Sequence, residues 1–302
     1  MDVDGRREDG GRVCLVTGGT GGIGAAVALA AARAGASVVV TGRDTGRGQA
    51  VLEELRALAP DGEHAFVPAD LALLESTAAL ADTVLDRAPR LDAVVLCAGI
   101  LSRVPEWTAE GLERALVVNY LSRYLLLRRL LPALDAAPSG RAVLVANAGR
   151  YRDTLDLDDL QHRRGRPGLA VAGRTQFAND LLAVELAERV AGSGTEVTCV
   201  YPGIVDTDVF RNARGFPAAA VRVARGVQGL LARSPEDAAR TPAHLAVDPG
   251  AVGVHGRFFG PGLRERAVPA RVRRPERRRA LWDASEQLVA PYLAAGRGVG
   301  EA

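Results

Sequence analysis

The residues whose chemistry is clearest form a glycine-rich stretch near the start of the chain. Gly18, Gly22 and Gly24 follow Thr17 at short, regular intervals. Glycine lets the backbone approach a pyrophosphate closely, and the free N–H groups of a helix N-terminus attract its negative charge. The stretch therefore predicts a dinucleotide-binding turn. Its expected cofactor-binding residues are Thr17, Gly18, Thr20, Gly22, Ile23 and Gly24.

The elements that must position such a turn are present on both sides of it. The apolar run Val13–Val16 predicts a buried strand, and Ala25–Ala34 is a run of helix formers that ends before Gly35. Ser37–Val40 is a second apolar run and predicts the next strand of a parallel pair. A strand, a glycine turn, a helix and a strand in this order form a dinucleotide-binding unit.

The glycine spacing resembles the signature of the short-chain dehydrogenase/reductase family. Within that family, the helix that opens at Val117 and the pattern Asp158–Gln161 are similar to the retinol dehydrogenase branch. The similarity extends over residues 12–292. It implies an α/β fold with a Rossmann-type doubly wound parallel sheet.

The resemblance also sets the expected domain organisation. Residues 11–302 are expected to form one NADP(H)-binding domain after a disordered tail at 1–10, with 204–232 as a candidate helical substrate lid. A length of 302 residues and an apolar content of 48% are enough for one sizeable core.

Composition narrows the class of partner. The formal net charge is only +2, so nucleic acid and membrane surfaces are not expected partners. Three cysteines in apolar strand-like runs predict reduced, packed thiols and a cytoplasmic location rather than a disulfide framework. No metal site is expected, and the oligomeric state is left open. All 38 basic residues are arginines, so the chain has no lysine.

The residues at the end of the second predicted strand indicate which cofactor the protein prefers. Gly42 stands where an NAD-binding protein places an acid for the ribose 2′-OH, and Arg43 after it suits a 2′-phosphate, so NADPH or NADP⁺ is expected rather than NADH. Asp44 is the alternative, as a displaced ribose ligand. The resemblance places Asp70 and Leu71 against the adenine; the alternative for Asp70 is a helix cap.

The resemblance supplies the rest of the cofactor contacts. Ala98 and Gly99 are expected beside the ribose, although Leu96 and Cys97 replace the two asparagines that relatives have before them. Asn119 corresponds to the residue that kinks the following helix and holds a water linked to the catalytic lysine. The residues expected around the nicotinamide are Pro202, Gly203, Val205 and Thr207.

The catalytic positions depart from the family. Relatives use a tyrosine to protonate the oxygen, a lysine to lower its pKa and hold the ribose, and a serine to polarise the carbonyl. The aligned positions here hold Ala172, Gln176 and Asn147. Because the sequence contains no lysine, that residue has not moved elsewhere. Asn147 can donate a hydrogen bond as serine would, or it can simply form a turn. Gln176 is expected to keep only the ribose contact.

Three functions of different class follow. The first is an NADPH-dependent ketoreductase of an aromatic polyketide-like molecule whose own phenol supplies the proton, as in the atypical angucyclinone ketoreductases that this chain resembles. The second is a non-redox cyclase or isomerase that retains NADP(H), and the third is a cofactor-binding pseudoenzyme. If the substrate is not the acid, Tyr151, His162 and Thr175 are the alternative proton donors.

Four further expectations concern the frame of the fold. His64 is expected on the surface of an edge strand, and the basic run 271–279 is expected to be solvated. Ser234 followed by Pro235 predicts a helix start, with the serine as its N-cap. Arg257–Gly260 is expected to be the last strand.

Overall fold

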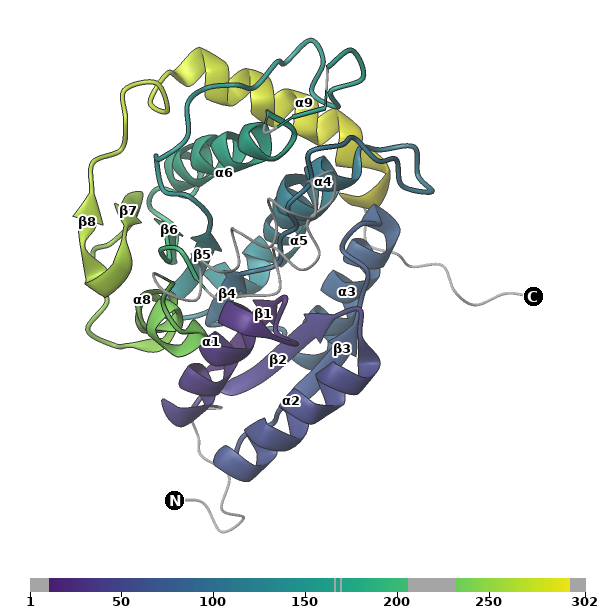
Figure 1. Ribbon diagram of the computed structural model, residues 1–302. Coiled ribbons are helices and arrows are strands. Elements are labelled where there is room, and N and C mark those ends of the chain that lie inside the picture. The colour runs from purple at the N-terminus through teal and green to yellow at the C-terminus, as the bar shows by residue number, and fades with distance from the viewer. Residues whose placement is uncertain (1–10, 166, 169, 206–231, 294–302) are drawn as a thin grey trace.

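An eight-stranded sheet runs through the part of the chain that the computed structural model describes, which is residues 11–165, 167–168, 170–205 and 232–293 (Figure 1). The strand order is β3-β2-β1-β4-β5-β6-β7-β8. Neighbouring strands are parallel except for β7 and β8. The strands are β1 (Val13–Thr17), β2 (Ser37–Gly42), β3 (Ala65–Pro68), β4 (Ala93–Leu96), β5 (Gly140–Val145), β6 (Thr195–Val200), β7 (Arg257–Phe259) and β8 (Glu265–Arg266).

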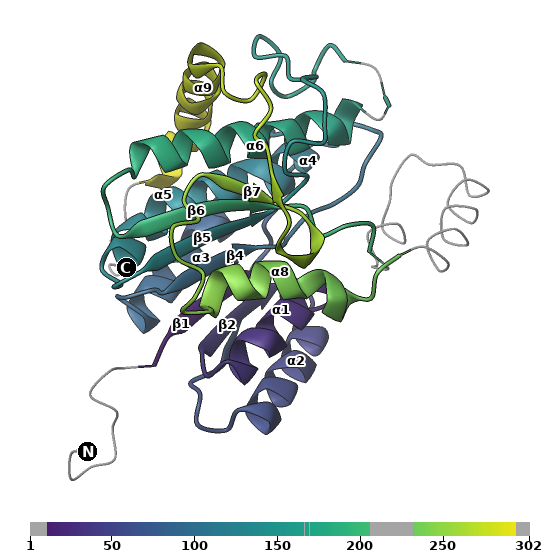
Figure 2. The same ribbon diagram turned by 90° about the vertical axis from the view of Figure 1, so that its left-hand side faces the viewer.

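Helices cover both faces of the sheet (Figure 2). On one face lie α1, α2 and α8; on the other lie α3, α5 and α6, with α9 packed outside them. The helices are α1 (Gly22–Arg33), α2 (Thr45–Leu58), α3 (Leu74–Arg87), α4 (Arg114–Leu116), α5 (Ser122–Asp135), α6 (Ala170–Arg189), α8 (Pro235–Val247) and α9 (Pro275–Leu293), with a π-helix at Val117–Leu121 and a 3₁₀-helix at Pro261–Leu263. The predicted Rossmann-type doubly wound fold is confirmed.

The central strands are apolar on both faces because each face has its own core. In β1, Cys14 and Val16 pack in the core beside α1 and α8, whereas Leu15 packs in the core beside α3 and α5. Successive side chains of a strand point to opposite faces, so a strand covered on both sides is an unbroken apolar run. This is why short runs such as 13–16 could be recognised without alternation.

Three expectations about the frame are wrong. His64 is buried, because its Nδ1 accepts a hydrogen bond from Val38 N (3.2 Å) and ties the loop before β3 to β2. The basic run is not solvated throughout: Arg278 is buried in ion pairs with Glu185 and Glu188. Arg257–Phe259 is not the last strand, because β8 adds to its edge in antiparallel direction.

The predicted start of α8 is confirmed. Ser234 Oγ accepts a hydrogen bond from Asp237 N (3.1 Å), and Pro235 is the first helical residue. Within the described ranges, no helix combines the length and the apolar character needed to span a membrane. The expected tail at 1–10 and most of the expected lid, residues 206–231, lie outside the described residues.

Candidate functional site

The glycine turn sits between the carboxyl end of β1 and the start of α1. Gly18 (φ 65°) turns the chain out of the strand, and a Cβ there would lie 2.9 Å from Ala98 Cα. A Cβ on Gly24 would overlap Gly18 O, so only glycine lets α1 pack this close to the turn. Gly21 caps α1 without a side-chain hydrogen bond, and the first turn of the helix has no acidic residue.

This turn fits a dinucleotide pyrophosphate. The first N–H groups of α1 receive no side-chain cap, and a Cβ at the exposed Gly21 would meet nothing within 4 Å. Open space beside uncapped N–H groups is the arrangement in which a helix N-terminus binds a phosphate. The residues that would hold the pyrophosphate are those of the predicted turn.

The end of β2 carries the residues expected to bind the adenine ribose and to distinguish its 2′-phosphate from a 2′-OH. A Cβ on Gly42 would lie 2.6 Å from Thr20 Oγ1, so Thr20 fills the space where an acidic side chain would begin. Arg43 is exposed, and its Nε lies 3.9 Å from Asp70 Oδ1. Arg43, which is predicted to bind the 2′-phosphate, and Asp70, which is predicted to contact the adenine, are therefore neighbours. Asp44 is the N-cap of α2, where its Oδ1 accepts a hydrogen bond from Arg47 N (3.0 Å), so it has a structural role.

Asp70 does not cap the next helix, because the N-cap of α3 is Leu73. Its Oδ1 instead accepts a hydrogen bond from Ala72 N (3.0 Å) in the loop before that helix. Leu71 is buried in the core. The alternative of a helix cap is thus wrong for Asp70, and its carboxylate faces Arg43.

The residues after β4 meet the glycine turn from the side. Ala98 N donates to Thr17 Oγ1 (3.2 Å), which joins the ends of β4 and β1. Asn119 lies in the π-helix, where Oδ1 accepts from Ile100 N (2.7 Å) and Nδ2 donates to Ile100 O (3.0 Å) and Thr175 Oγ1 (3.1 Å). Asn119 thus fixes the loop of Ala98 and Gly99 against α6.

Arg123 is a functional candidate that sequence reasoning missed. It is buried, and it donates to Ala98 O (2.7 Å) and Val145 O (2.9 Å), the carbonyls that follow β4 and end β5. Burial lowers the pKa of its guanidinium to about 10. The group therefore stays charged at neutral pH, directly behind the loop of Ala98 and Gly99. An arginine next to a leucine run in a helix carries no sequence signal of such a role.

The structure brings two of the predicted catalytic positions together. Asn147 follows the end of β5, Gln176 lies on α6, and Asn147 Nδ2 donates to Gln176 Oε1 (2.8 Å). Ala172 lies one turn earlier on α6. The amides of Asn147 and Gln176, two of the positions expected to be catalytic, are therefore in direct contact.

The turn after β6 carries three of the four residues expected to lie around the nicotinamide. Pro202 is buried, Gly203 has φ 99°, and Val205 forms an isolated bridge with Arg233. A Cβ on Gly203 would lie 3.0 Å from Cδ of the flexible Arg233 side chain, so the turn favours glycine because of its positive φ rather than for lack of space. Thr207 lies outside the described residues.

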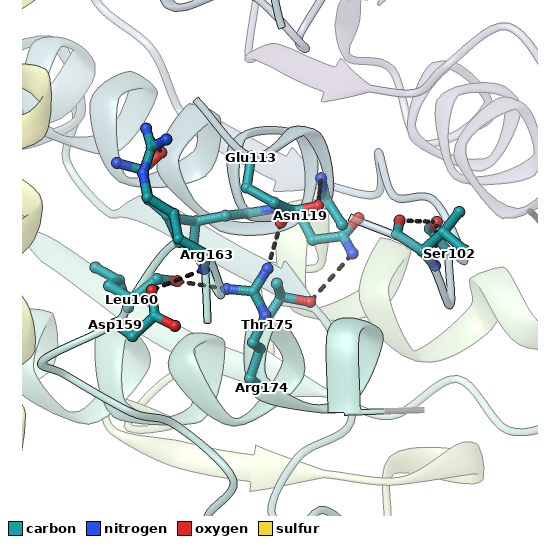
Figure 3. A network of polar contacts seen from close by, with 12 residues as sticks. Ser102, Glu113, Asn119, Asp159, Leu160, Arg163, Arg174 and Thr175 are labelled. Atoms are coloured by element: carbon teal, nitrogen blue, oxygen red, sulfur yellow. Dashed lines mark hydrogen bonds and ion pairs between the residues drawn. The ribbon is translucent and has the colours of Figure 1, made fainter. Parts of the chain in front are cut away.

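A buried ion pair braces the helix that carries Gln176 (Figure 3). Arg174 pairs with Glu113, both nearly inaccessible, and also donates to Leu160 O. Glu113 in turn caps α4 by accepting from Ala115 N (3.0 Å) and Leu116 N (2.8 Å). This network joins α4, the 153–168 insertion and α6.

The three alternative proton donors occupy different surroundings. Tyr151 is 40% exposed, and a Cβ on Gly173, next to Ala172, would lie 3.4 Å from its ring. Thr175 is fully buried against Asn119. His162 lies in the insertion, at φ 56°. Within the described ranges, no three His, Cys, Asp or Glu side chains gather as metal ligands.

Comparison with known proteins identifies the family. The model of the family described as short chain dehydrogenase matches residues 12–154. Human dehydrogenase/reductase SDR family member 13 is 35% identical over 293 residues, covering 96% of this chain and 75% of that protein. The chain belongs to the short-chain dehydrogenase/reductase family.

Two further likenesses agree with this assignment. Mouse retinol dehydrogenase 14 is 31% identical over 289 residues, covering 92% of this chain and 86% of that protein, as the predicted branch implies. A crystal structure of an uncharacterised protein from Mycobacterium paratuberculosis has a TM-score of 0.70 and 28% identity, with 92% and 93% of the two chains covered.

The first prediction concerns Arg43. Its replacement in Arg43→Ala is expected to raise the dissociation constant of NADPH by roughly 10-fold or more, because a charged hydrogen-bond partner of the 2′-phosphate is lost. NADH binding should change little. Fluorescence titration with both cofactors measures this, and Arg47→Ala, an exposed arginine paired with Asp44, is the matched control. Equal losses for the two cofactors would remove Arg43 from phosphate recognition.

The second prediction concerns the buried ion pair. Arg174→Met should lower the free energy of unfolding by about 3–5 kcal/mol, because the Glu113 carboxylate is left buried without its charged partner. Urea denaturation measures the change. Arg240→Met is the control, since Arg240 forms an exposed pair with Asp237 and should matter by about 1 kcal/mol or less. Similar losses in both variants would contradict a bracing role for Arg174.

Proposed function

We propose that this chain is an NADPH-dependent ketoreductase that acts on an aromatic polyketide-type ketone without the family's tyrosine and lysine. One observation carries the proposal: the hydrogen bond from Asn147 Nδ2 to Gln176 Oε1. The two side chains in contact are neutral amides, which donate and accept hydrogen bonds but release no proton at neutral pH. The protein is thus equipped to orient a ketone and a cofactor, while the proton comes from elsewhere.

Among the residues that the structure describes, each amide keeps a donor that forms no hydrogen bond in this arrangement. The Nδ2 group of Asn147 has two N–H bonds, one of which is directed to Gln176, and the second can donate to the ketone oxygen. The Nε2 group of Gln176 can donate to a ribose hydroxyl. Asn147 thus takes the polarising role of the serine, and Gln176 keeps the binding role of the lysine without its charge.

The remaining requirement is an acid, and the substrate can provide it. Bound NADPH would supply the hydride that adds to the carbonyl carbon. A phenol beside the ketone gives its proton to the carbonyl oxygen, and water returns a proton to the phenolate. General acid catalysis is worth on the order of 10²–10⁴-fold, whereas positioning can supply roughly 7–11 kcal/mol. Loss of a protein acid is therefore compatible with turnover of such a substrate.

The preference for NADPH rests on the end of β2. Thr20 fills the space beside Gly42 that an acid for the ribose 2′-OH would need. Arg43 is exposed at the same place and offers a positive charge to a 2′-phosphate. Both features favour the phosphorylated cofactor.

The third prediction tests the substrate as acid. 8-Hydroxy-1-tetralone should be reduced on the order of 10-fold or more faster than its 8-methoxy counterpart, because only the phenol can protonate the oxygen. Loss of nicotinamide absorbance and chromatography of the alcohol measure the two rates. Equal rates would mean that a side chain such as Tyr151 delivers the proton. Binding of NADPH without reduction of either ketone would favour the cyclase, isomerase or pseudoenzyme alternatives.

The fourth prediction separates the two amides. Asn147→Ala should lower kcat roughly 3- to 10-fold, the worth of one hydrogen bond to the ketone, and leave the dissociation constant of NADPH unchanged. Gln176→Ala should do the reverse, raising that constant a few-fold. Steady-state kinetics and cofactor titration provide both readouts. An Asn147→Ala variant with normal kcat would reduce this residue to a turn former.

A further inference from the structure

The turn that presents Asn147 has a backbone that needs external support. Arg150 N donates to Asn147 O (3.1 Å), and the two residues between them lie at positive φ. The φ of Ala148 is 41° and that of Gly149 is 78°. A residue with a Cβ is strained in this region, and such strain persists only where surrounding contacts over-determine the conformation.

Helix α6 supplies that support at two points. Gln176 Oε1 accepts from Asn147 Nδ2 (2.8 Å), and Asp180 Oδ2 accepts from Gly149 N (2.9 Å). Gln176 and Asp180 are four residues apart, so they lie on one face of the helix. Asp180 thus fixes the turn two residues after the side chain that is proposed to touch the ketone.

Asp180 is an unusual residue for its place. It is fully buried, and its Oδ1 lies 3.7 Å from Cys199 Sγ on β6. The charged groups that face it are Arg266, which donates to Ala148 O (3.3 Å), and Arg271, which donates to Gly149 O (2.8 Å). Neither forms an ion pair with Asp180 within the described residues. Burial raises the pKa of Asp180 to about 7.

We propose that Asp180 is a positioning residue for the reduction, and that the ionisation of its carboxyl group sets how firmly the turn presents Asn147. The inference rests on the proposed function. An ionised carboxylate accepts a stronger, charge-assisted hydrogen bond from Gly149 N than a neutral carboxyl group does. Asn147 is therefore held best when Asp180 has lost its proton.

The same ionisation acts on stability in the opposite direction. The pKa of Asp180 is raised from an ordinary value of 3.8 in the unfolded chain to about 7 in the fold. Between these values the folded protein keeps a proton that the unfolded chain has released, so the contribution of Asp180 to stability falls as the pH rises. Through neutrality the turn becomes better held while the protein becomes less stable.

The fifth prediction is tested first on the cofactor-free protein. With ¹³C-labelled aspartate and ¹⁵N-labelled glycine, one carboxyl group and the Gly149 amide should titrate together near pH 7. In Asp180→Asn, which keeps an oxygen acceptor, both transitions should disappear. Asp283→Asn, an exposed aspartate on α9, should leave them unchanged. A Gly149 amide that ignores pH through neutrality overturns the proposal, and this titration of the unaltered protein needs no variant.

The second measurement links the turn to turnover. The ratio of kcat for the unaltered protein to kcat for Asp180→Asn, with 8-hydroxy-1-tetralone, should rise several-fold from pH 6 to pH 8 while KM for NADPH stays equal. Ionisations that both proteins share cancel in this ratio. A flat ratio overturns the link to catalysis. If neither tetralone is reduced, the proposed function fails, and the Gly149 titration still decides whether Asp180 holds the turn.

Discussion

Parallel pairing of β4 with β1 and β5 is the constraint on which the site depends. Thr17 is paired with Leu96, and Leu96 is paired with Leu144, so the three strands end at one edge. The glycine turn, the loop of Ala98 and Gly99, and the turn that begins at Asn147 all follow directly from those ends. Arg123 joins two of them by donating to carbonyls after β4 and at the end of β5. Residues distant in sequence are thereby held within hydrogen-bond reach of one another.

At this edge of the sheet, neutral polar side chains lie in front of buried charged groups. The two candidate catalytic side chains that touch each other, Asn147 and Gln176, are neutral, whereas ionisable groups lie deeper in the protein. Arg123 is a buried cation behind the loop of Ala98 and Gly99, and Asp180 is a buried acid behind the turn that follows Asn147. In a medium of low dielectric constant such groups act on their surroundings more strongly than exposed ones do. The amide dipoles of Asn147 and Gln176 and the two buried charged groups therefore set the electrostatics of this edge.

The sequence predicts those parts of the structure that depend on local pattern. The glycine turn and the strands that are buried on both faces were predicted, because each leaves its mark in a few consecutive residues. The buried state of His64 was not predictable, since it depends on Val38 N, which comes from another strand. Asp180 was missed because an acid within a helix usually faces water, and only the fold reveals Gly149 opposite it.

The π-helix at Val117–Leu121 has a consequence for how this chain can change. The hydrogen bonds of a π-helix span one residue more than those of an α-helix. A single π-turn within a helix therefore resembles the insertion of one residue into that helix. Deleting one residue there would restore an ordinary helix and rotate Asn119 by about 100°, away from Ile100 and Thr175. A change in the length of this segment would therefore break the three hydrogen bonds of the Asn119 side chain at once. The π-helix thus makes the length of the segment a structural requirement beside the identity of Asn119.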